Sequence, residues 1–376
     1  MIDGKETTSS VPFLDLAASH APLKGAILEE ISELIDSGAF TNGPQVAAFE
    51  SAFAEFCGTR YCVGTASGLD ALRLAFIAAG TQPGDEVILP ANTFAATLES
   101  VIQAGAEPVL VDVAESDYNL DPAAVEAAIT PRTRFLLPVH LYGQLADMSA
   151  LTKIAREHDL AIVEDACQAH GAERDGFRAG TGGLAGCFSF YPGKNLGAFG
   201  DAGACVTGDE DLAAHVRALR EHGQRRKYFH DFEGYTARLD TIQALALSHK
   251  LPLLAGWNEE RRAAASFYAQ ALAGVGDVVL PPVPEGSSPV WHLYVVRTAE
   301  PTELAASLRE RGIGCGHHYP IPLHLLPAYE RLGYEPGSFP VTERLAAEAV
   351  SLPIFPGIGA AQLEAVIEAI GDYFRG

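Results

Sequence analysis

Seven short apolar runs recur along the first half of the chain. Each is rich in valine, isoleucine, leucine or phenylalanine, is too brief for a helix, and is more continuously apolar than a half-exposed strand. Such runs are typical of strands buried on both faces. The predicted strands are RYCVGTA (60–66), DEVILP (85–90), EPVLVDV (107–113), TRFLLPVHL (133–141), LAIVED (160–165), CFSFYP (187–192) and GACVTG (203–208).

Amphipathic stretches lie between most of these runs. Among them are LDALRLAFIAAG (69–80), DPAAVEAAIT (121–130) and MSALTKIAREH (148–158), each of which predicts a helix. The alternation of strands with helices predicts a mostly parallel sheet that is covered by helices. No helix separates the last two strands, which indicates an antiparallel member. We therefore predict an α/β fold around a seven-stranded, mostly parallel sheet.

The pattern changes after about residue 240. The elements predicted there are a long helical run (241–272), a Pro-rich loop (278–289), a strand (290–297), a helix (302–312), and two terminal helices around the break SLPIFPG (351–357). We expect a large domain at 1–245 and a smaller α+β domain at 246–376.

Composition places the chain among globular proteins. Its 376 residues are 48% hydrophobic and 20% charged, and the formal net charge is -22. This charge repels nucleic acid and anionic lipid, so we expect neither as a partner, and an anionic ligand would need a locally basic site. No run approaches the roughly 20 apolar residues of a membrane span, no secretory signal is evident, and the six cysteines lack paired spacing. We expect a cytoplasmic protein with reduced thiols.

One lysine stands apart from the rest. Four others lie in the N-terminal tail or on predicted helix faces, where a solvated charge is the simple explanation: Lys5, Lys24, Lys153 and Lys250. Lys194 instead follows a predicted strand, in a turn where Gly193 and Gly197 permit close backbone approach. Burial would lower its pKa, as a Schiff-base lysine requires. The local sequence alone slightly favours the alternative, an ammonium in water at the end of the sheet.

Two further features, taken together with Lys194, suit a cofactor site. LAIVED ends in Glu164 and Asp165, and open α/β sheets bind ligands at the carboxyl ends of strands, although an acid there is as often a helix N-cap. Pyridoxal phosphate needs a lysine for its aldehyde and a carboxylate for its pyridinium nitrogen. Residues 65–68 lie between a strand and a helix, whose free amides suit a phosphate, and the Ser189 hydroxyl is a further candidate.

Seven ordered motifs carry a family resemblance. They are SGLDAL, PANTFAAT, PVHLYGQ, EDACQAHGA, FSFYPGKNLGAFGDAGA, ARLDTIQA and HYPIPLH. In this order and spacing they resemble the DegT-type sugar aminotransferases, from about Val11 to the C-terminus. These are pyridoxal-phosphate enzymes of the aspartate-aminotransferase fold. The resemblance therefore implies fold type I, pyridoxal 5'-phosphate as cofactor, and transamination.

The resemblance also implies roles for particular residues. Lys194 forms the internal aldimine and Asp165 pairs with the pyridine nitrogen, so these two are the implied catalytic residues. The other implied cofactor contacts are Gln168 to the ring hydroxyl, Phe94 on the ring face, and Ser67, Gly68 and Ser189 to the phosphate.

A homodimer with shared active sites is implied as well. In the family a neighbouring subunit contributes the segment that corresponds to 234–238. The family usually has asparagine where this chain has Thr236, and that asparagine contacts the cofactor phosphate. Threonine is shorter and offers a hydroxyl instead of an amide, which leaves this contact open.

The implied substrates are a nucleotide-diphosphate sugar and glutamate, which leaves as 2-oxoglutarate. HGQRRKYFHD (222–231) gathers three cations in an acidic chain and suits a diphosphate, although a solvated loop explains it about as well. The substrate contacts implied by the resemblance are Lys227, Tyr228, Arg238, His318 and Tyr319. PGKNLGAFGD is similar to members that aminate carbon 3 of a 3-keto-6-deoxyhexose, commonly linked to dTDP. Members acting on carbon 4 more often have Thr-Thr-Gly-Glu after the lysine.

Three rival interpretations are weaker. GTGGLAG (180–186) is similar to a dinucleotide loop, but it leads into a strand instead of following one. His317, His318 and His324 lack the spacing of a helical metal pair, so we expect no metal. A non-catalytic regulatory protein on this fold stays open, but the presence of both Lys194 and Asp165 argues for catalysis.

Overall fold

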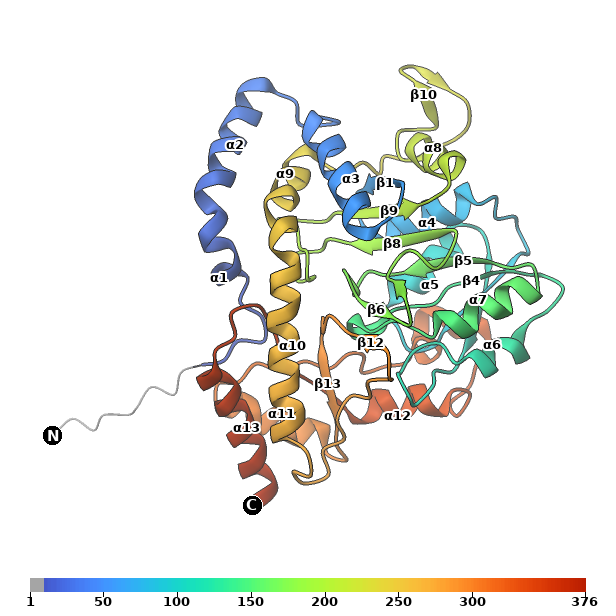
Figure 1. Cartoon of the computed structure of the whole chain (residues 1–376). Coiled ribbons are helices and arrows are strands. Elements are labelled where there is room, and N and C mark those ends of the chain that lie inside the picture. Colours follow the sequence, from blue (N-terminus) through green and yellow to red (C-terminus); the bar gives the residue numbers. More distant parts are fainter. Residues whose placement is uncertain (1–9) are drawn as a thin grey trace.

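The computed structural model describes residues 10–376 and is built around one large sheet (Figure 1). The seven strands lie in the order β1-β9-β8-β5-β4-β2-β3. Their bounds are β1 Tyr61–Thr65, β2 Glu86–Pro90, β3 Glu107–Val111, β4 Thr133–Leu136, β5 Ala161–Asp165, β8 Ala185–Ser189 and β9 Gly203–Thr207. All seven strands predicted from the apolar runs are confirmed.

The strand directions place many loops at one edge of the sheet. β2 is parallel to β3 and β4, β4 to β5, and β5 to β8. β9 is antiparallel to both β8 and β1, which confirms the predicted antiparallel member. Since β1 opposes β9, it points the same way as the other five strands. Six carboxyl ends therefore meet at the same edge, where open α/β sheets bind ligands.

Helices cover both faces of the sheet. One face packs against α3 (Pro44–Cys57), α6 (Pro122–Ala128), α7 (Met148–Glu157) and α9 (Thr241–Lys250), and the other against α4 (Gly68–Ala78), α5 (Ala95–Gln103) and α8 (Glu210–Leu219). Side chains alternate along each strand, so Ile88 joins the first core while Val87 and Leu89 join the second. The helices predicted at 69–80, 121–130 and 148–158 are confirmed as α4, α6 and α7.

Short elements complete the ends and edges of this layer. At the N-terminal side α1 (Leu16–His20), η1 (Ala21–Leu23) and α2 (Lys24–Ser37) lead into α3, and α2 stands beside α9 (Figure 1). The remaining short elements are η2 (Leu141–Gly143), β6 (Glu173–Arg174), β7 (Phe177–Arg178), and the hairpin β10 (Gln224–Arg226) and β11 (Phe229–His230).

Below the sheet in Figure 1 lies an apolar cluster that is separate from the two sheet cores. Leu323, Tyr329 and Phe339 instead pack in the second sheet core. Both sets belong to the C-terminal part. Its elements are α10 (Leu254–Ala271), β12 (Ser287–Ser288), β13 (Tyr294–Arg297), α11 (Pro301–Glu310), η4 (Leu323–Leu325), η5 (Pro327–Leu332), α12 (Pro340–Glu348), β14 (Ala349–Leu352) and α13 (Ala360–Arg375). The predicted domain division at 245 falls within α9, and that boundary stays a prediction.

Three predictions for this part need correction. The helical run 241–272 is two helices, α9 and α10, because the turn η3 (Leu251–Leu253) contains Pro252, which cannot donate a backbone hydrogen bond. The predicted break at 351–357 begins inside β14, which pairs antiparallel with β13. The predicted loop 278–289 includes β12, which pairs with β6. Of the helices within residues 10–376, none is long and apolar enough to cross a bilayer.

Candidate active site

Loops after three strands meet at one point of the carboxyl edge. Gly68 follows β1, and a Cβ added there would lie 2.7 Å from Cys167 Sγ and 2.7 Å from Ser189 Cβ. These two neighbours come from the ends of β5 and β8. Only glycine fits so close an approach, which brings the start of α4 against the other two loops.

Asp165 ends β5 as a buried carboxylate held by neutral donors. Its Oδ2 accepts a hydrogen bond of 2.7 Å from Thr97 Oγ1, at the start of α5. Its Oδ1 accepts one of 3.1 Å from the amide of Cys167. Within residues 10–376 Asp165 forms no ion pair. A buried carboxylate is costly unless it is paired, so this geometry suits a cationic ligand.

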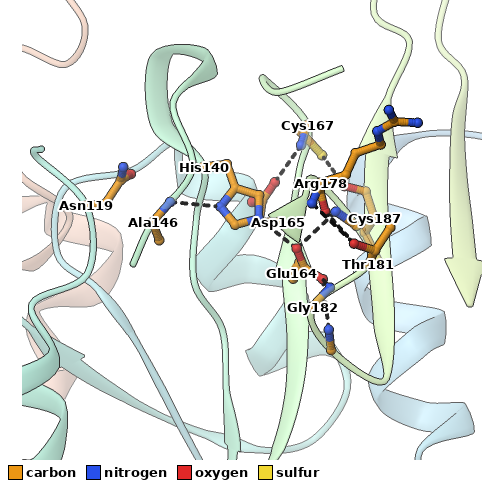
Figure 2. Close-up of polar contacts among 12 residues, drawn as sticks. Asn119, His140, Ala146, Glu164, Asp165, Cys167, Arg178, Thr181, Gly182 and Cys187 are labelled. Carbon is orange, nitrogen blue, oxygen red and sulfur yellow. Dashed lines mark hydrogen bonds and ion pairs between the residues drawn. The ribbon is translucent and has the colours of Figure 1, made fainter. Parts of the chain in front are cut away.

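Glu164 points to the opposite face of β5 and holds a loop (Figure 2). Its carboxylate binds His140 Nε2 at 2.8 Å and the amides of Gly180, Gly182 and Gly183 at 2.9, 2.7 and 3.0 Å. The glycine-rich segment 180–186 therefore uses its amides on a carboxylate of its own chain. This arrangement explains the glycines without a dinucleotide.

Lys194 projects from a tightly closed turn after β8. The Lys194 amide donates to Tyr191 O at 2.8 Å, and a Cβ added at Gly197 would lie only 2.2 Å from Pro192 O. The lysine is half-buried, and this burial lowers its pKa, against the opposing effects of Cys167 and Asp165. Of the two alternatives for this residue, the structure favours the desolvated amine over the ammonium in water.

A third group of side chains lies beside Asp165. Gln168 Oε1 accepts a hydrogen bond of 2.7 Å from the Tyr142 amide, and its Nε2 donates to Tyr319 Oη at 3.1 Å. The Tyr319 ring lies 5.7 Å from the ring of Phe94, which is 56% exposed. His318 precedes Tyr319 and stacks on Phe13. A segment distant in sequence thus reaches the loops after β2 and β5.

The start of α4, which lies against Cys167 and Ser189, has features that suit an anion. Ser67 is the N-cap of α4, and its Oγ accepts from the Asp70 amide at 3.0 Å. The first amides of a helix have no intrahelical acceptor, and they favour an anion. Ser189 Oγ accepts from the Tyr191 amide at 3.2 Å, and its own proton is available for donation.

The proposed substrate residues divide into two groups. His318 and Tyr319 lie at the site, whereas Lys227 and Tyr228 lie on the exposed β10–β11 hairpin at the margin of the molecule (Figure 1). Arg238 lies beside the end of β1, and its Nη1 pairs with Glu221 Oε1 at 2.9 Å. The roles of all five in substrate binding stay predictions.

Thr236 has a partner within its own chain. Its Oγ1 lies 3.0 Å from His222 Nε2, so the hydroxyl is engaged in a local hydrogen bond. The family contact of the corresponding asparagine with the cofactor phosphate stays open for this chain.

Three residues that support the site were not predicted from the sequence, and one of them was assigned a wrong environment. Thr97 orients Asp165, and its only signal was helical spacing from Phe94. His170 Nε2 donates to Ser189 O at 2.9 Å and fixes the end of β8. Lys250 was predicted to be solvated, which is wrong. It is 1% exposed and donates to Gly197 O at 2.6 Å, because its face of α9 packs on the Lys194 turn.

The three clustered histidines of the C-terminal part have separate partners. His317 binds Ala346 O, His318 binds Ser351 Oγ, and His324 binds Glu343 Oε1. Across residues 10–376 no group of three His, Cys, Asp or Glu side chains is placed to hold a metal ion.

The site as a whole fits pyridoxal phosphate. A desolvated amine suits the aldehyde, the unpaired carboxylate of Asp165 suits the ring nitrogen, the exposed face of Phe94 suits the ring, and the start of α4 suits the phosphate. On this sheet topology, these features define the class of pyridoxal-phosphate enzymes of fold type I.

Comparisons with known proteins agree with this class. Residues 22–371 match the DegT/DnrJ/EryC1/StrS aminotransferase family. The chain is 47% identical over 372 residues to dTDP-3-amino-3,4,6-trideoxy-alpha-D-glucose transaminase of Streptomyces venezuelae, with 99% of this chain and 98% of that protein covered. It is 44% identical over 368 residues to a pleiotropic regulatory protein of Geobacillus stearothermophilus, with 97% and 99% covered.

A solved structure agrees as closely. S. venezuelae DesV in complex with a ketimine intermediate matches with a TM-score of 0.96 at 47% identity, covering 98% of this chain and 99% of that one. The chain belongs to the DegT/DnrJ/EryC1/StrS aminotransferase family. It is an aminotransferase with pyridoxal 5'-phosphate as cofactor, which confirms the resemblance seen in the sequence.

The lowered pKa of Lys194 gives a first prediction. An amine acylates only when it is unprotonated, so Lys194 in the cofactor-free protein should reach half-maximal labelling below about pH 10.4, the ordinary lysine value. The measurement is acetic anhydride labelling across pH 7 to 11, quantified by peptide mass spectrometry. A midpoint at or above the ordinary value would contradict the desolvated amine.

The neighbouring carboxylates give a second prediction. Glu164→Gln should lower the free energy of unfolding of the cofactor-free protein by about 2–4 kcal/mol, because an amide nitrogen would replace an oxygen among amide donors. Asp165→Asn should lower it by about 1 kcal/mol or less, because its retained oxygen still accepts from Cys167, yet reduce turnover at least about a hundredfold. Denaturant titration and assay check both, and equal stability losses would refute the division of roles.

Proposed function

We propose that this enzyme transfers nitrogen from glutamate to carbon 3 of a nucleotide-linked 3-keto-6-deoxyhexose, with dTDP as the expected nucleotide. The observation that carries the proposal is the joint placement of Lys194 and Asp165 at the carboxyl edge. The substrate class is supported by 47% identity to a dTDP-3-amino sugar transaminase over 99% of the chain. The sequence after Lys194 supports carbon 3.

The proposed chemistry divides among a few side chains. When bound, the cofactor supplies a sink for the electrons left when an amino-acid Cα loses its proton. The Asp165 carboxylate holds a proton on the ring nitrogen, and Thr97 fixes that carboxylate. The Lys194 amine takes the Cα proton as a general base and returns it as a general acid, a role that its lowered pKa favours.

Other side chains orient the cofactor and the sugar. Gln168 is fixed by the Tyr142 amide and by Tyr319, so its amide is held beside the site. The rings of Phe94 and Tyr319 lie with their centroids 5.7 Å apart and offer an aromatic surface to the cofactor and the sugar. Desolvation lowers the pKa of His318 to about 4, so this residue stays neutral near pH 7 and binds sugar hydroxyls without adding charge.

The enzyme acts as a homodimer in this proposal. Apolar side chains of the α2 region are exposed, with Leu28 at 53%, Ile35 at 61% and Phe40 at 52%. A groove of about 370 Å³ between α1, α2 and Phe199 adds to this surface. A second copy would cover these groups, and it would present its β10–β11 hairpin and Arg238 to the neighbouring site. The six cysteines are all free, which supports a cytoplasmic location.

Two other functions differ in what they require. A 4-keto sugar would use the same Lys194 and Asp165, and only the sequence after the lysine disfavours it. A regulatory function without catalysis is the other, and one relative of 44% identity is named a pleiotropic regulatory protein. Such a function gives no reason for an amine of lowered pKa beside an unpaired carboxylate, so we place it behind transamination.

Substrate assays give the third prediction. Purified enzyme with pyridoxal phosphate and glutamate should aminate dTDP-linked 3-keto-6-deoxyhexoses and convert 4-keto isomers at least about a hundredfold more slowly, since the site must place one carbon at the amine. Products are identified by mass and by NMR of the aminated carbon. Lys194→Ala should abolish turnover with either. Formation of only a 4-amino product would overturn the choice of carbon 3.

A further inference from the structure

Lys250 is a buried cation beside the Lys194 turn. It ends α9, is 1% exposed, and donates hydrogen bonds to Gly197 O at 2.6 Å and His20 Nε2 at 2.7 Å. Its ammonium lies 4.5 Å from the centre of the Phe199 ring. In the part of the chain that the structure describes, no carboxylate pairs with it.

An unpaired buried ammonium is unfavourable for folding. Burial alone lowers the Lys250 pKa to about 8. An apolar side chain of similar length would avoid the desolvation cost. The position therefore needs a cationic donor for another purpose, and its shortest hydrogen bond points to the Lys194 turn.

The backbone that Lys250 holds is directly linked to Lys194. Gly197 is packed so closely that an added Cβ would touch Pro192 O, so displacement of Gly197 would displace the start of the turn as well. Gln243 lies two helical turns before Lys250 on the same face of α9, and its Oε1 accepts from the Phe199 amide at 2.8 Å. α9 therefore holds the turn through two hydrogen bonds, one from Lys250 to Gly197 and one from Phe199 to Gln243.

α10 and the segment before β13 also hold the same turn. Asn195 follows Lys194, and its Nδ2 donates to Asn258 Oδ1 at 3.0 Å and to Val290 O at 2.8 Å. Among residues 10–376, the Lys194 side chain has no hydrogen-bond or ion-pair partner. The reactive amine is therefore oriented only through the backbone that its neighbours fix.

We propose that Lys250 is a positioning residue, whose ammonium, held by His20, fixes Gly197 and thereby the orientation of the Lys194 amine. The inference rests on the proposed function for its kinetic part only. Lys250 and Lys194 line one small cavity of about 30 Å³, together with Asp15, His20 and Arg261, which are the other charged or titratable groups there.

The test compares Lys250→Met, which keeps an unbranched side chain of similar length but removes the amine, with Lys153→Met at an exposed helical site. Lys250→Met should lower kcat about ten- to a hundredfold and change KM for the nucleotide sugar less than about threefold, because the amine is misplaced but the sugar contacts remain. The pH midpoint of Lys194 acylation in the cofactor-free protein should rise by about 0.5 or more, since release of Gly197 would let the turn move and expose the amine to solvent. Lys153→Met should change none of these.

Two further variants separate positioning from loss of stability. Ile370→Ala opens the apolar cluster around α13, which is separate from the core that contains the turn, and should lower the melting temperature without moving the acylation midpoint. His20→Leu removes the anchor of the ammonium near the surface, and should shift the midpoint in the same direction as Lys250→Met by a smaller amount. This variant decides the matter if Lys250→Met does not fold.

An unchanged acylation midpoint in the folded Lys250→Met or His20→Leu protein would overturn the inference. Equal shifts in Ile370→Ala would also overturn it, since loss of stability would then suffice. The midpoint requires neither cofactor nor sugar. An error in the proposed substrate would abolish wild-type turnover while leaving this readout intact.

Discussion

An amine and a carboxylate must share one small site without neutralising each other, and the rest of the structure depends on this constraint. Asp165 is satisfied by a threonine hydroxyl and a backbone amide, so its charge stays available to a ligand. Lys194 is oriented by the backbone of its turn, and burial lowers its pKa. The parallel sheet makes the pairing possible because it delivers the ends of β5 and β8 to one edge.

The alternation of side chains along β5 assigns two adjacent acids to different tasks. Glu164 faces the side of α6 and α7, where it gathers three amides and a histidine and closes the glycine-rich loop. Asp165 faces α5 and the ligand. One strand therefore both stabilises the fold and supplies the electrostatic centre of the site, and a shift of one residue in its register would exchange the two roles.

The sequence predicts the sheet and the chemistry better than it predicts which elements pack against one another. The seven strands are buried on both faces, so their apolar runs identify them, whereas the four-residue β14 is too short to show a pattern outside its pairing with β13. Asp165 is recognisable from its place at a strand end. Lys250 is not, because helical spacing does not reveal that its face meets the Lys194 turn. Lys227 and Tyr228 lie on the exposed β10–β11 hairpin, and their predicted substrate contacts can be tested only in the dimer.

The central claim is that Lys194, and no other lysine, bonds to the cofactor. Reduction of the holoenzyme with borohydride fixes the cofactor to whichever amine it is bonded to, and peptide mass spectrometry then locates it. The account predicts one reduced cofactor per chain, on the peptide that contains Lys194, and none in the Lys194→Ala protein. Attachment to Lys227 or Lys250, or no attachment in a protein that still turns over, would contradict it.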